Sequence, residues 1–397
     1  MEKVYLRPRR EDSILRFHPW VFSGAIASVT GNPAEGDLVA VHSSDGQYLA
    51  TGHYQIGSIA VRILSFDEDP TAPDFWEKMV RKAFDVRVAC GLHGSATTNC
   101  YRLIHGEGDG LPGLIIDYYD GVCVLQAHSV GMFKAKGAIC EALKAVYGDT
   151  LKAVYDKSSG TAPFKAGLDL VDGYLYKADG FDTDECVVLE NSNKFHVNWN
   201  EGQKTGFFLD QRENRAAVGR LAKGRSVLNL FCYTGGFSIY ALNGGAVHVD
   251  SVDSSRKAMD MVDRNVALNG FTPEQHTSYC ADAIDFLRDV PDGKYDLMIV
   301  DPPAFAKHRG ALKNALRAYQ RLNAAAIAKV APGGFVFTFS CSQVVDKEAF
   351  ALAVFSAAAQ TGRSVRILDR LNQPADHAVN IYHPEGEYLK GLLLYVE

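Results

Sequence analysis

The stretch that most constrains the fold is residues 227–241, which read VLNLFCYTGGFSIYA. Its first five residues form a short apolar run of the kind found in strands buried on both faces of a sheet. The segment 234–236 (TGG) then permits a tight turn, and apolar residues resume at helical spacing from Phe237. A strand, a glycine turn and a helix open the βαβ units that bind nucleotides, so the sequence predicts a parallel α/β sheet here.

The glycine turn also indicates the kind of ligand. It lacks the G-x-G-x-x-G fingerprint that brings a backbone against a pyrophosphate. The next expected strand, residues 246–253, ends on Asp253, where such folds bind a ribose hydroxyl. A ligand with adenosine but no phosphate fits this pattern, and S-adenosylmethionine is the commonest of that kind. The alternative is a glycine turn that only joins a strand to a helix.

Composition narrows the class of protein. The 397 residues are enough for two or three domains, and 47% apolar and 22% charged residues are typical of a soluble globular chain. No apolar run reaches the ~18 residues of a membrane span. The eight cysteines include no C-x-x-C pair, so we expect no metal site and no disulfide framework, and a reducing cytoplasm. The net charge of −6 argues against a protein that coats nucleic acid over its whole surface.

The first half of the chain is predicted to form two small domains. Residues 1–71 read as an all-β unit, because short apolar segments such as 39–41, 48–52 and 59–64 alternate with turn residues. Arg16 and Trp20 near its start are candidates for RNA contact, although Trp20 could instead belong to the core. After a polar linker that contains two prolines, residues 72–190 are predicted to form an α+β domain.

Residues 191–397 are predicted to form the third domain. Strand-like and helical segments alternate along it, which indicates a mostly parallel sheet with helices on both faces. Ligands of such sheets bind outside the carboxyl ends of the strands. Four side chains suited to binding or catalysis follow predicted strands: Asp253, Asp282, Asp301 and Cys341.

The segment 203–212 precedes this sheet and has an unusual composition. Phe208, Asp210 and Arg212 could enclose the adenine or methionine part of a cofactor. The alternative is a hairpin that packs its phenylalanines into the core, and the pattern alone favours that alternative.

Asp301 begins a rigid loop, because Pro302 and Pro303 fix the backbone and cannot continue a strand ladder. An acid and an aromatic ring on a rigid loop at a strand end are suited to holding a planar base against a methyl donor. We therefore expect catalysis to involve Asp301 and the base to stack on Phe305. Lys307 opens a basic cluster that could contact RNA, although charge runs are usually solvated faces. The alternative for the loop is a stiff turn with a core phenylalanine.

Cys341 is the most informative residue in the chain. Carbon 5 of a pyrimidine is a poor nucleophile, and a thiolate that adds to carbon 6 activates it for methylation. A base must then remove the carbon 5 proton so that the thiol can leave. The candidates for that base are Asp376, His377, Glu385 and Glu387, and the sequence does not choose among them.

With these residues the chain resembles the bacterial 23S rRNA 5-methylcytosine methyltransferases that carry an N-terminal PUA domain. The resemblance covers nearly the whole chain and rests on six motifs: residues 202–212 (GQKTGFFLDQR), 229–237 (NLFCYTGGF), 252–255 (VDSS), 301–305 (DPPAF), 340–342 (SCS) and 384–392 (PEGEYLKGL). It implies an RNA-binding PUA domain, a central α+β domain and a Rossmann-like methyltransferase domain that acts on 23S rRNA.

The resemblance also implies roles for individual residues. Cys341 would be the nucleophile, and S-adenosylmethionine would be surrounded by Phe231, Tyr233, Gly235, Asp253, Asp282 and Asp301. A related branch that methylates a guanine nitrogen shares the DPP-x-F loop but lacks the cysteine, so Cys341 favours cytosine. Many other RNA 5-methylcytosine enzymes carry a second cysteine in the aspartate–proline loop, where this chain has Pro303 and Ala304. The proton acceptor is therefore unassigned.

Two other functions stay open at this point. One is a guanine-nitrogen rRNA methyltransferase on the same fold, in which Cys341 is inert. The other is a non-catalytic RNA-binding assembly factor with a vestigial cofactor site. The oligomeric state is also open, and a homodimer is one possibility.

Overall fold

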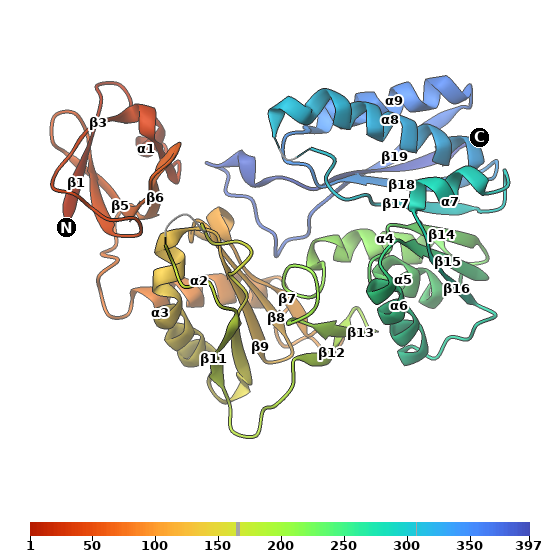
Figure 1. Ribbon diagram of the computed structural model, residues 1–397, viewed down its shortest axis with the longest axis horizontal. Coiled ribbons are helices and arrows are strands. Elements are labelled where there is room, and N and C mark those ends of the chain that lie inside the picture. The colour runs from red at the N-terminus through yellow and green to blue at the C-terminus, as the bar shows by residue number, and fades with distance from the viewer. Residues whose placement is uncertain (164–166, 307) are drawn as a thin grey trace. The chain divides into compact units, whose positions relative to one another are not determined.

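The computed structural model describes residues 1–163, 167–306 and 308–397 (Figure 1). The chain divides into two compact units, each built from more than one stretch of sequence. The first unit comprises Met1–Val188, Val197–Leu209 and Ala375–Gly386, and the second comprises Leu189–His196, Asp210–Pro374 and Glu387–Glu397. Among the described residues, no helix combines the length and apolar character needed to cross a membrane.

The first unit begins with a small β-structure. Its strands lie in the order β2-β6-β5-β4-β1-β3. Their bounds are β1 (Glu2–Leu6), β2 (Trp20–Phe22), β3 (Ile26–Val29), β4 (Leu38–His42), β5 (Tyr48–Tyr54) and β6 (Ile59–Ser65), with one short helix, α1 (Asp12–Leu15). Alternate residues of these strands, such as Val39 and Val41, point into one apolar core. The three strands predicted from the sequence are confirmed.

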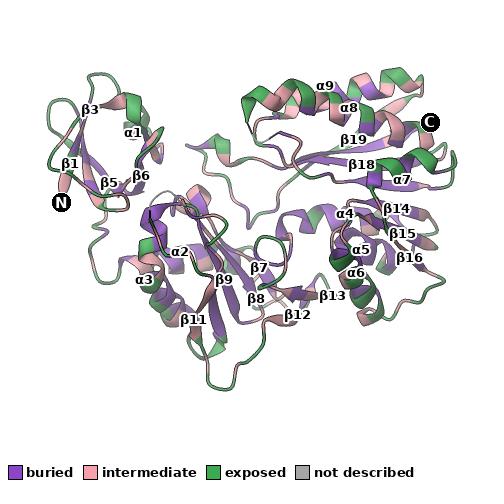
Figure 2. Ribbon diagram, viewed as in Figure 1, coloured by how far each residue is buried: buried purple, intermediate pink, exposed green. Residues whose placement is uncertain are grey.

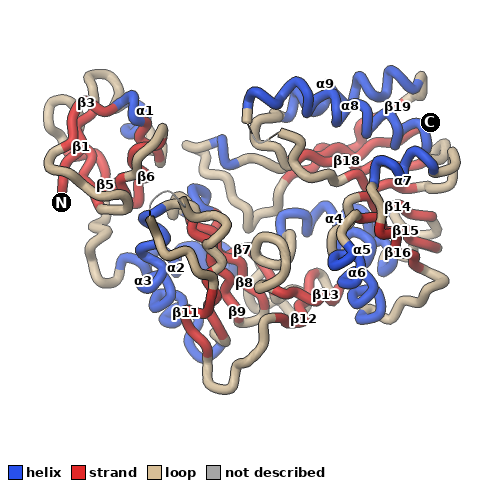
Figure 3. The backbone as a smooth tube through the Cα atoms, viewed as in Figure 1, coloured by secondary structure: helices blue, strands red, loops and turns tan. Residues whose placement is uncertain are grey.

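A second sheet in the same unit has the order β11-β10-β9-β8-β7 and packs against two helices (Figure 3). The elements are β7 (Cys100–His105), β8 (Leu114–Tyr119), β9 (Val122–Ala127), β10 (Ala153–Asp156), β11 (Gly173–Lys177), α2 (Phe75–Ala89) and α3 (Val130–Tyr147). Helix α3 begins at Val130, because the Ser129 hydroxyl accepts a hydrogen bond from Met132 N and caps the helix. Farther along, β12 (Glu185–Glu190) and β13 (Asn193–Asn198) form a two-stranded sheet.

The second unit contains the large sheet that the sequence predicts. Its order is β16-β15-β14-β17-β18-β20-β19, parallel from β16 to β18, with β20 antiparallel to both neighbours. The strands are β14 (Ser226–Leu230), β15 (His248–Asp253), β16 (His276–Cys280), β17 (Leu297–Val300), β18 (Gly334–Ser340), β19 (Val365–Asn372) and β20 (Lys390–Val396). Strands β17 and β18 are buried throughout, as expected for strands covered on both faces (Figure 2).

Helices cover both faces of this sheet (Figure 1). Helices α7 (Ala283–Asp289), α8 (Leu312–Lys329) and α9 (Lys347–Thr361) share one apolar core with the sheet. Helices α4 (Arg212–Leu221), α5 (Gly236–Asn243) and α6 (Arg256–Leu268) lie on the other side. The predicted fold class, a Rossmann-like sheet preceded by a small all-β structure and an α+β region, is therefore confirmed. The division into domains at residues 71 and 190 stays a prediction.

Candidate functional site

The turn after β14 has an unusual backbone. Phe231 and Tyr233 adopt positive φ angles of 57° and 47°, and Gly235 follows with φ 80°. For residues with a Cβ, this conformation costs roughly 1–2 kcal/mol each, and it persists only where the surroundings hold it. Tyr233 N donates to Asp253 Oδ2 at 3.0 Å, and Asn265 Nδ2 donates to Thr234 O at 2.9 Å. The turn is thus fixed from two sides, with Phe231 and Tyr233 only half-buried.

Asp253 links two strand-end turns through its carboxylate. Its Oδ2 accepts from Tyr233 N, and its Oδ1 accepts from Ser255 N at 2.9 Å. A carboxylate has about four acceptor positions, so this half-buried group retains capacity for a ligand's hydroxyls. The predicted ribose-binding residue therefore has the position and the chemistry for that role.

Asp282 is held by the helix that it begins. Its Oδ1 accepts hydrogen bonds from Ile284 N at 2.9 Å and Asp285 N at 3.0 Å, which caps α7. The residue is exposed, and it follows β16 on the same edge of the sheet as Asp253. The cap fixes the carboxylate at the carboxyl edge of the sheet, the edge at which open α/β sheets bind their ligands.

Residues 210–214 bring a hydrogen-bond network to the loop that contains Asp301. Gln211 Nε2 donates to Asp301 Oδ2 at 2.9 Å, and Asn214 Nδ2 donates to Gln211 Oε1 at 2.6 Å. Asp210 Oδ2 accepts from Tyr388 Oη at 2.6 Å. Arg212 is almost fully buried, and its Nε lies 3.4 Å from Glu213 Oε1. Helix α4 was not predicted, and Gln211 entered the sequence analysis only as one residue of the motif 202–212, without a role of its own.

Cys341 follows β18 and is half-buried, whereas Cys100, Cys123, Cys140 and Cys232 are buried. The serines on either side of it are fixed by one tyrosine. Ser340 Oγ donates to Tyr319 Oη at 2.9 Å, and Tyr319 Oη lies 3.2 Å from Ser342 Oγ. Ser342 Oγ also accepts from Ala306 N at 3.4 Å, which ties the cysteine turn to the loop after Asp301.

Phe305 belongs to the same cluster. Its ring lies 4.7 Å from that of Tyr319, centroid to centroid, and it remains partly exposed. The structure therefore brings together the loop 301–306 and Cys341, as the sequence predicts. Lys307 lies outside the described residues.

Lys390 is a group near Cys341 that the sequence analysis did not select. It is 5% exposed, and its Nζ donates to Ser342 O at 2.7 Å and Val345 O at 2.6 Å. Burial lowers its pKa to about 8. In the sequence, Lys390 is one residue of the motif 384–392, which indicates no role for it, and its place beside Cys341 follows only from the β18–β20 pairing.

The other predicted contact residues lie in the first unit. Phe208 is half-buried, with Lys204 Nζ 4.9 Å from its ring centre. Arg16 is exposed at the end of α1, and Trp20 donates from Nε1 to Glu107 Oε1 at 2.8 Å. Trp20 is half-buried and thus has surface left for a ligand.

The candidate proton acceptors differ in their surroundings. Asp376 and His377 are buried in the first unit, where Asp376 Oδ2 accepts from Arg102 N at 3.0 Å. Glu385 is exposed there, and Glu387, in the second unit, is exposed and pairs with Lys347. None of these contacts selects one of the four as the base.

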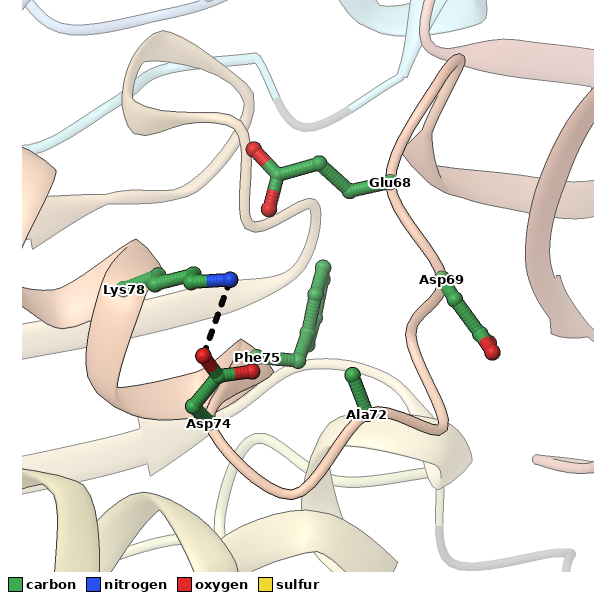
Figure 4. Close-up of a pocket in the computed structure, with 6 residues that line it drawn as sticks. All are labelled: Glu68, Asp69, Ala72, Asp74, Phe75 and Lys78. Atoms are coloured by element: carbon green, nitrogen blue, oxygen red, sulfur yellow. Dashed lines mark ion pairs between the residues drawn. The ribbon is translucent and has the colours of Figure 1, made fainter.

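Two further features lie in the first unit. A cavity of ≈ 280 Å³ is lined by residues of the linker and of the start of α2, and a Lys78–Asp74 ion pair lies in its wall (Figure 4). The potential metal ligands of His18, His383 and Glu385 lie within 4.8 Å of one another. His383 packs at 4.2 Å on the Trp20 ring, and His18 Nδ1 accepts from Trp20 N at 3.1 Å.

Comparison with known families agrees with this geometry. The family model for S-adenosylmethionine-dependent methyltransferases matches residues 102–393. This chain belongs to that family. A second family model, that of a PUA-like domain, matches residues 4–66 of the methyltransferase.

Several curated relatives match the methyltransferase over nearly its full length. Ribosomal RNA large subunit methyltransferase I of Pseudoalteromonas translucida is 40% identical over 394 residues, with 98% of each chain covered. The protein of the same name from Aeromonas hydrophila is 39% identical over 397 residues, again with 98% of each chain covered.

Solved structures agree with the fold of the methyltransferase. SMU.776, crystallised with SAH, matches with a TM-score of 0.85, 23% identity and all of both chains covered. A candidate SAM-dependent methyltransferase from Streptococcus mutans matches with a TM-score of 0.84, also at 23% identity over all of both chains.

Proposed function

We propose that this methyltransferase forms 5-methylcytosine in large-subunit ribosomal RNA through a covalent bond between Cys341 and the base. The observation that carries the proposal is the half-buried thiol at the end of β18, tied through Ser342 to the loop that begins at Asp301. A nitrogen target would need no such thiol, because its lone pair attacks directly. The names of the relatives and the PUA-like domain support an rRNA substrate, which is made and modified in the cytoplasm.

The cofactor is S-adenosylmethionine, which supplies a methyl group on a positively charged sulfur. We assign its contacts to the fixed turn at Phe231, Tyr233 and Gly235, to Asp253 and Asp282, and to the network that reaches Asp301. Phe208, Asp210 and Arg212 complete this proposed set. The half-exposed rings and the spare acceptor positions of Asp253 suit an adenosine without phosphates.

The chemistry of the protein side can be written in three steps. The Cys341 thiolate forms a bond to carbon 6 of cytosine, which makes carbon 5 nucleophilic. After methylation, a base removes the proton from carbon 5. The carbon–sulfur bond then breaks, and its electron pair returns to sulfur. Because the target atom is hidden in stacked RNA, the base must leave its stack, and Phe305 offers a ring to receive it. We assign RNA contacts outside this pocket to Lys307, Arg16 and Trp20.

One incubation tests the proposal. The protein is mixed with labelled S-adenosylmethionine and rRNA that lacks the modification, and the labelled nucleoside is identified after digestion. The expected product is 5-methylcytidine. A methylated guanosine would overturn the cytosine assignment, and absence of both transfer and cofactor binding would favour a non-catalytic assembly factor.

A second experiment addresses the covalent step. RNA that carries 5-fluorocytidine at the target position has no proton to lose from carbon 5, so the enzyme–RNA adduct should accumulate and survive denaturation. A wild-type protein that methylates RNA but forms no adduct would contradict the role of Cys341.

None of the relatives or structures named above is described as a homodimer, and a homodimer is not part of the proposal.

A further inference from the structure

Lys390 is a buried residue whose ammonium group donates two hydrogen bonds to the turn that carries Cys341. It begins β20, where its Cα is paired with that of Ser340 in the antiparallel ladder with β18. Its Nζ donates to Ser342 O and Val345 O, the carbonyls of two residues that follow Cys341 in the chain. An ammonium has three N–H donors, so one remains beyond these two bonds. The cation is thus held within the backbone of the nucleophile's own turn.

A buried ammonium is costly unless a negative charge compensates it. Burial lowers the pKa of Lys390, and the strongest influence that raises it again is the charge of Cys341. Asp346 and Glu387 also raise the pKa, and Lys347 lowers it. Asp346 is already engaged as the N-cap of α9, and Glu387 pairs with Lys347. The thiolate is therefore the partner that most favours the charged form of Lys390, and by reciprocity Lys390 favours the thiolate.

We propose that Lys390 is a positioning residue that holds Cys341 as a thiolate, ready to attack a pyrimidine ring. The inference rests on the proposed function, because a thiolate serves only a reaction that uses the cysteine. In the resting enzyme, the thiol releases its proton to water while Lys390 stays protonated. When the carbon–sulfur bond breaks at the end of the reaction, the electron pair returns to a sulfur that again faces an ammonium.

The test measures thiol ionisation without RNA or cofactor. The full-length protein is alkylated with iodoacetamide between pH 5.5 and 9.5, and the rate at Cys341 is followed by peptide mass spectrometry. Exposed Cys90 serves as the internal reference. Lys390→Met removes the charge, Lys390→Gln removes it but keeps an N–H donor for the carbonyls, and Lys390→Arg keeps the charge.

The expected result is a shift in the pH profile. A nearby opposite charge lowers a pKa by about one unit or more, so both uncharged variants should alkylate Cys341 roughly tenfold more slowly at pH 7. Lys390→Arg should restore most of the rate, and the rate at Cys90 should not change. The matched control is Lys347→Met, which removes a lysine that is more exposed and contacts Glu387; its profile should match the wild type.

Two outcomes would overturn the inference. An unshifted profile in both uncharged variants would make Lys390 a structural residue only, and an equal shift in Lys347→Met would mean that net charge, not this position, sets the ionisation. Lys390→Gln and Lys390→Arg keep the question answerable if Lys390→Met does not fold. The alkylation experiment needs no RNA, so an unshifted profile would refute only the role of Lys390. A wrong product nucleoside would instead refute the proposed function.

Discussion

Two turns at the carboxyl edge of the same sheet are built by different means. The turn after β14 is shaped by its backbone, with Phe231 and Tyr233 at positive φ and backbone groups bound by neighbouring side chains. The turn after β18 is shaped by side chains, with Tyr319 and Lys390 bound to the residues around Cys341. A rigid backbone turn suits a cofactor that must be held in one position while it gives up its methyl group. A turn fixed by polar side chains can instead tune the reactivity of one atom.

The two turns should therefore be separable by mutation. Cys341→Ala should lower methyl transfer by on the order of 10⁴-fold or more, because no other group at this position can form the covalent bond. The affinity for S-adenosylmethionine, measured by calorimetry, should remain within twofold of the wild type. Retained turnover would show that the covalent step is absent.

The reciprocal change is Gly235→Ala in the cofactor turn. Gly235 has φ 80°, and a Cβ there would lie 3.2 Å from Val262 Cγ1. We expect a loss of about 1–2 kcal/mol in the free energy of unfolding and a roughly tenfold higher dissociation constant for the cofactor. Alkylation of Cys341 should not change.

Gly224→Ala provides the matched control for this prediction. Gly224 also has a positive φ, 72°, but a Cβ there would meet nothing within 4 Å. Gly224→Ala should lose a similar free energy of unfolding in a urea titration, and its affinity for the cofactor should not change. Equal cofactor affinity in both variants would mean that the turn at Gly235 does not hold the ligand.

Tyr319→Phe should loosen only the turn after β18. The variant removes the hydroxyl that lies between Ser340 and Ser342, two buried serines. We expect a loss of about 1 kcal/mol in stability and a severalfold lower turnover number at saturating cofactor. The Michaelis constant for S-adenosylmethionine should stay constant, and a rise in that constant would mean that the two turns are coupled.

The smallest expected effect concerns pH and His276, the first residue of β16. Burial lowers the pKa of His276, which contacts Ser251 Oγ through Nε2 at 2.7 Å, to about 4. The unfolded chain titrates near 6.5, so it binds the proton more readily than the folded protein. The stabilisation is complete above pH 6.5 and is lost as the pH falls towards 4.

Between pH 7 and 5.5 this residue should cost about 1 kcal/mol of the free energy of unfolding. The measurement is a urea titration at both pH values, with His276→Gln as the comparison, since that variant cannot titrate. If the wild type and the variant lose the same free energy of unfolding between the two pH values, other histidines account for the pH dependence.

The sequence predicted what depends on local pattern. The strand and turn at residues 227–236, the acid at the end of the next strand and the loop after Asp301 were all visible as short motifs, and the structure has them at one edge of one sheet. Helix α4 was not predicted, because its mixed polar composition resembles a loop. Its buried residues, such as Asn214 and Arg215, have partners distant in sequence.

The residues that the sequence missed are those whose roles depend on distant pairing. Gln211 meets Asp301 across 90 positions, and Lys390 meets Ser342 across 48. Neither residue belongs to a type that is rare in strands or loops, so composition gave no reason to select it. Only the arrangement of the sheet brings each of them beside a residue already expected to matter.

Strand β20 is late in the chain yet lies inside the sheet, between β18 and β19. Its insertion pairs an edge of each of these two strands, and unpaired strand edges invite wrong pairing. The same insertion brings Lys390 to the turn of Cys341. One strand therefore both completes the sheet and supplies the positive charge beside the sulfur.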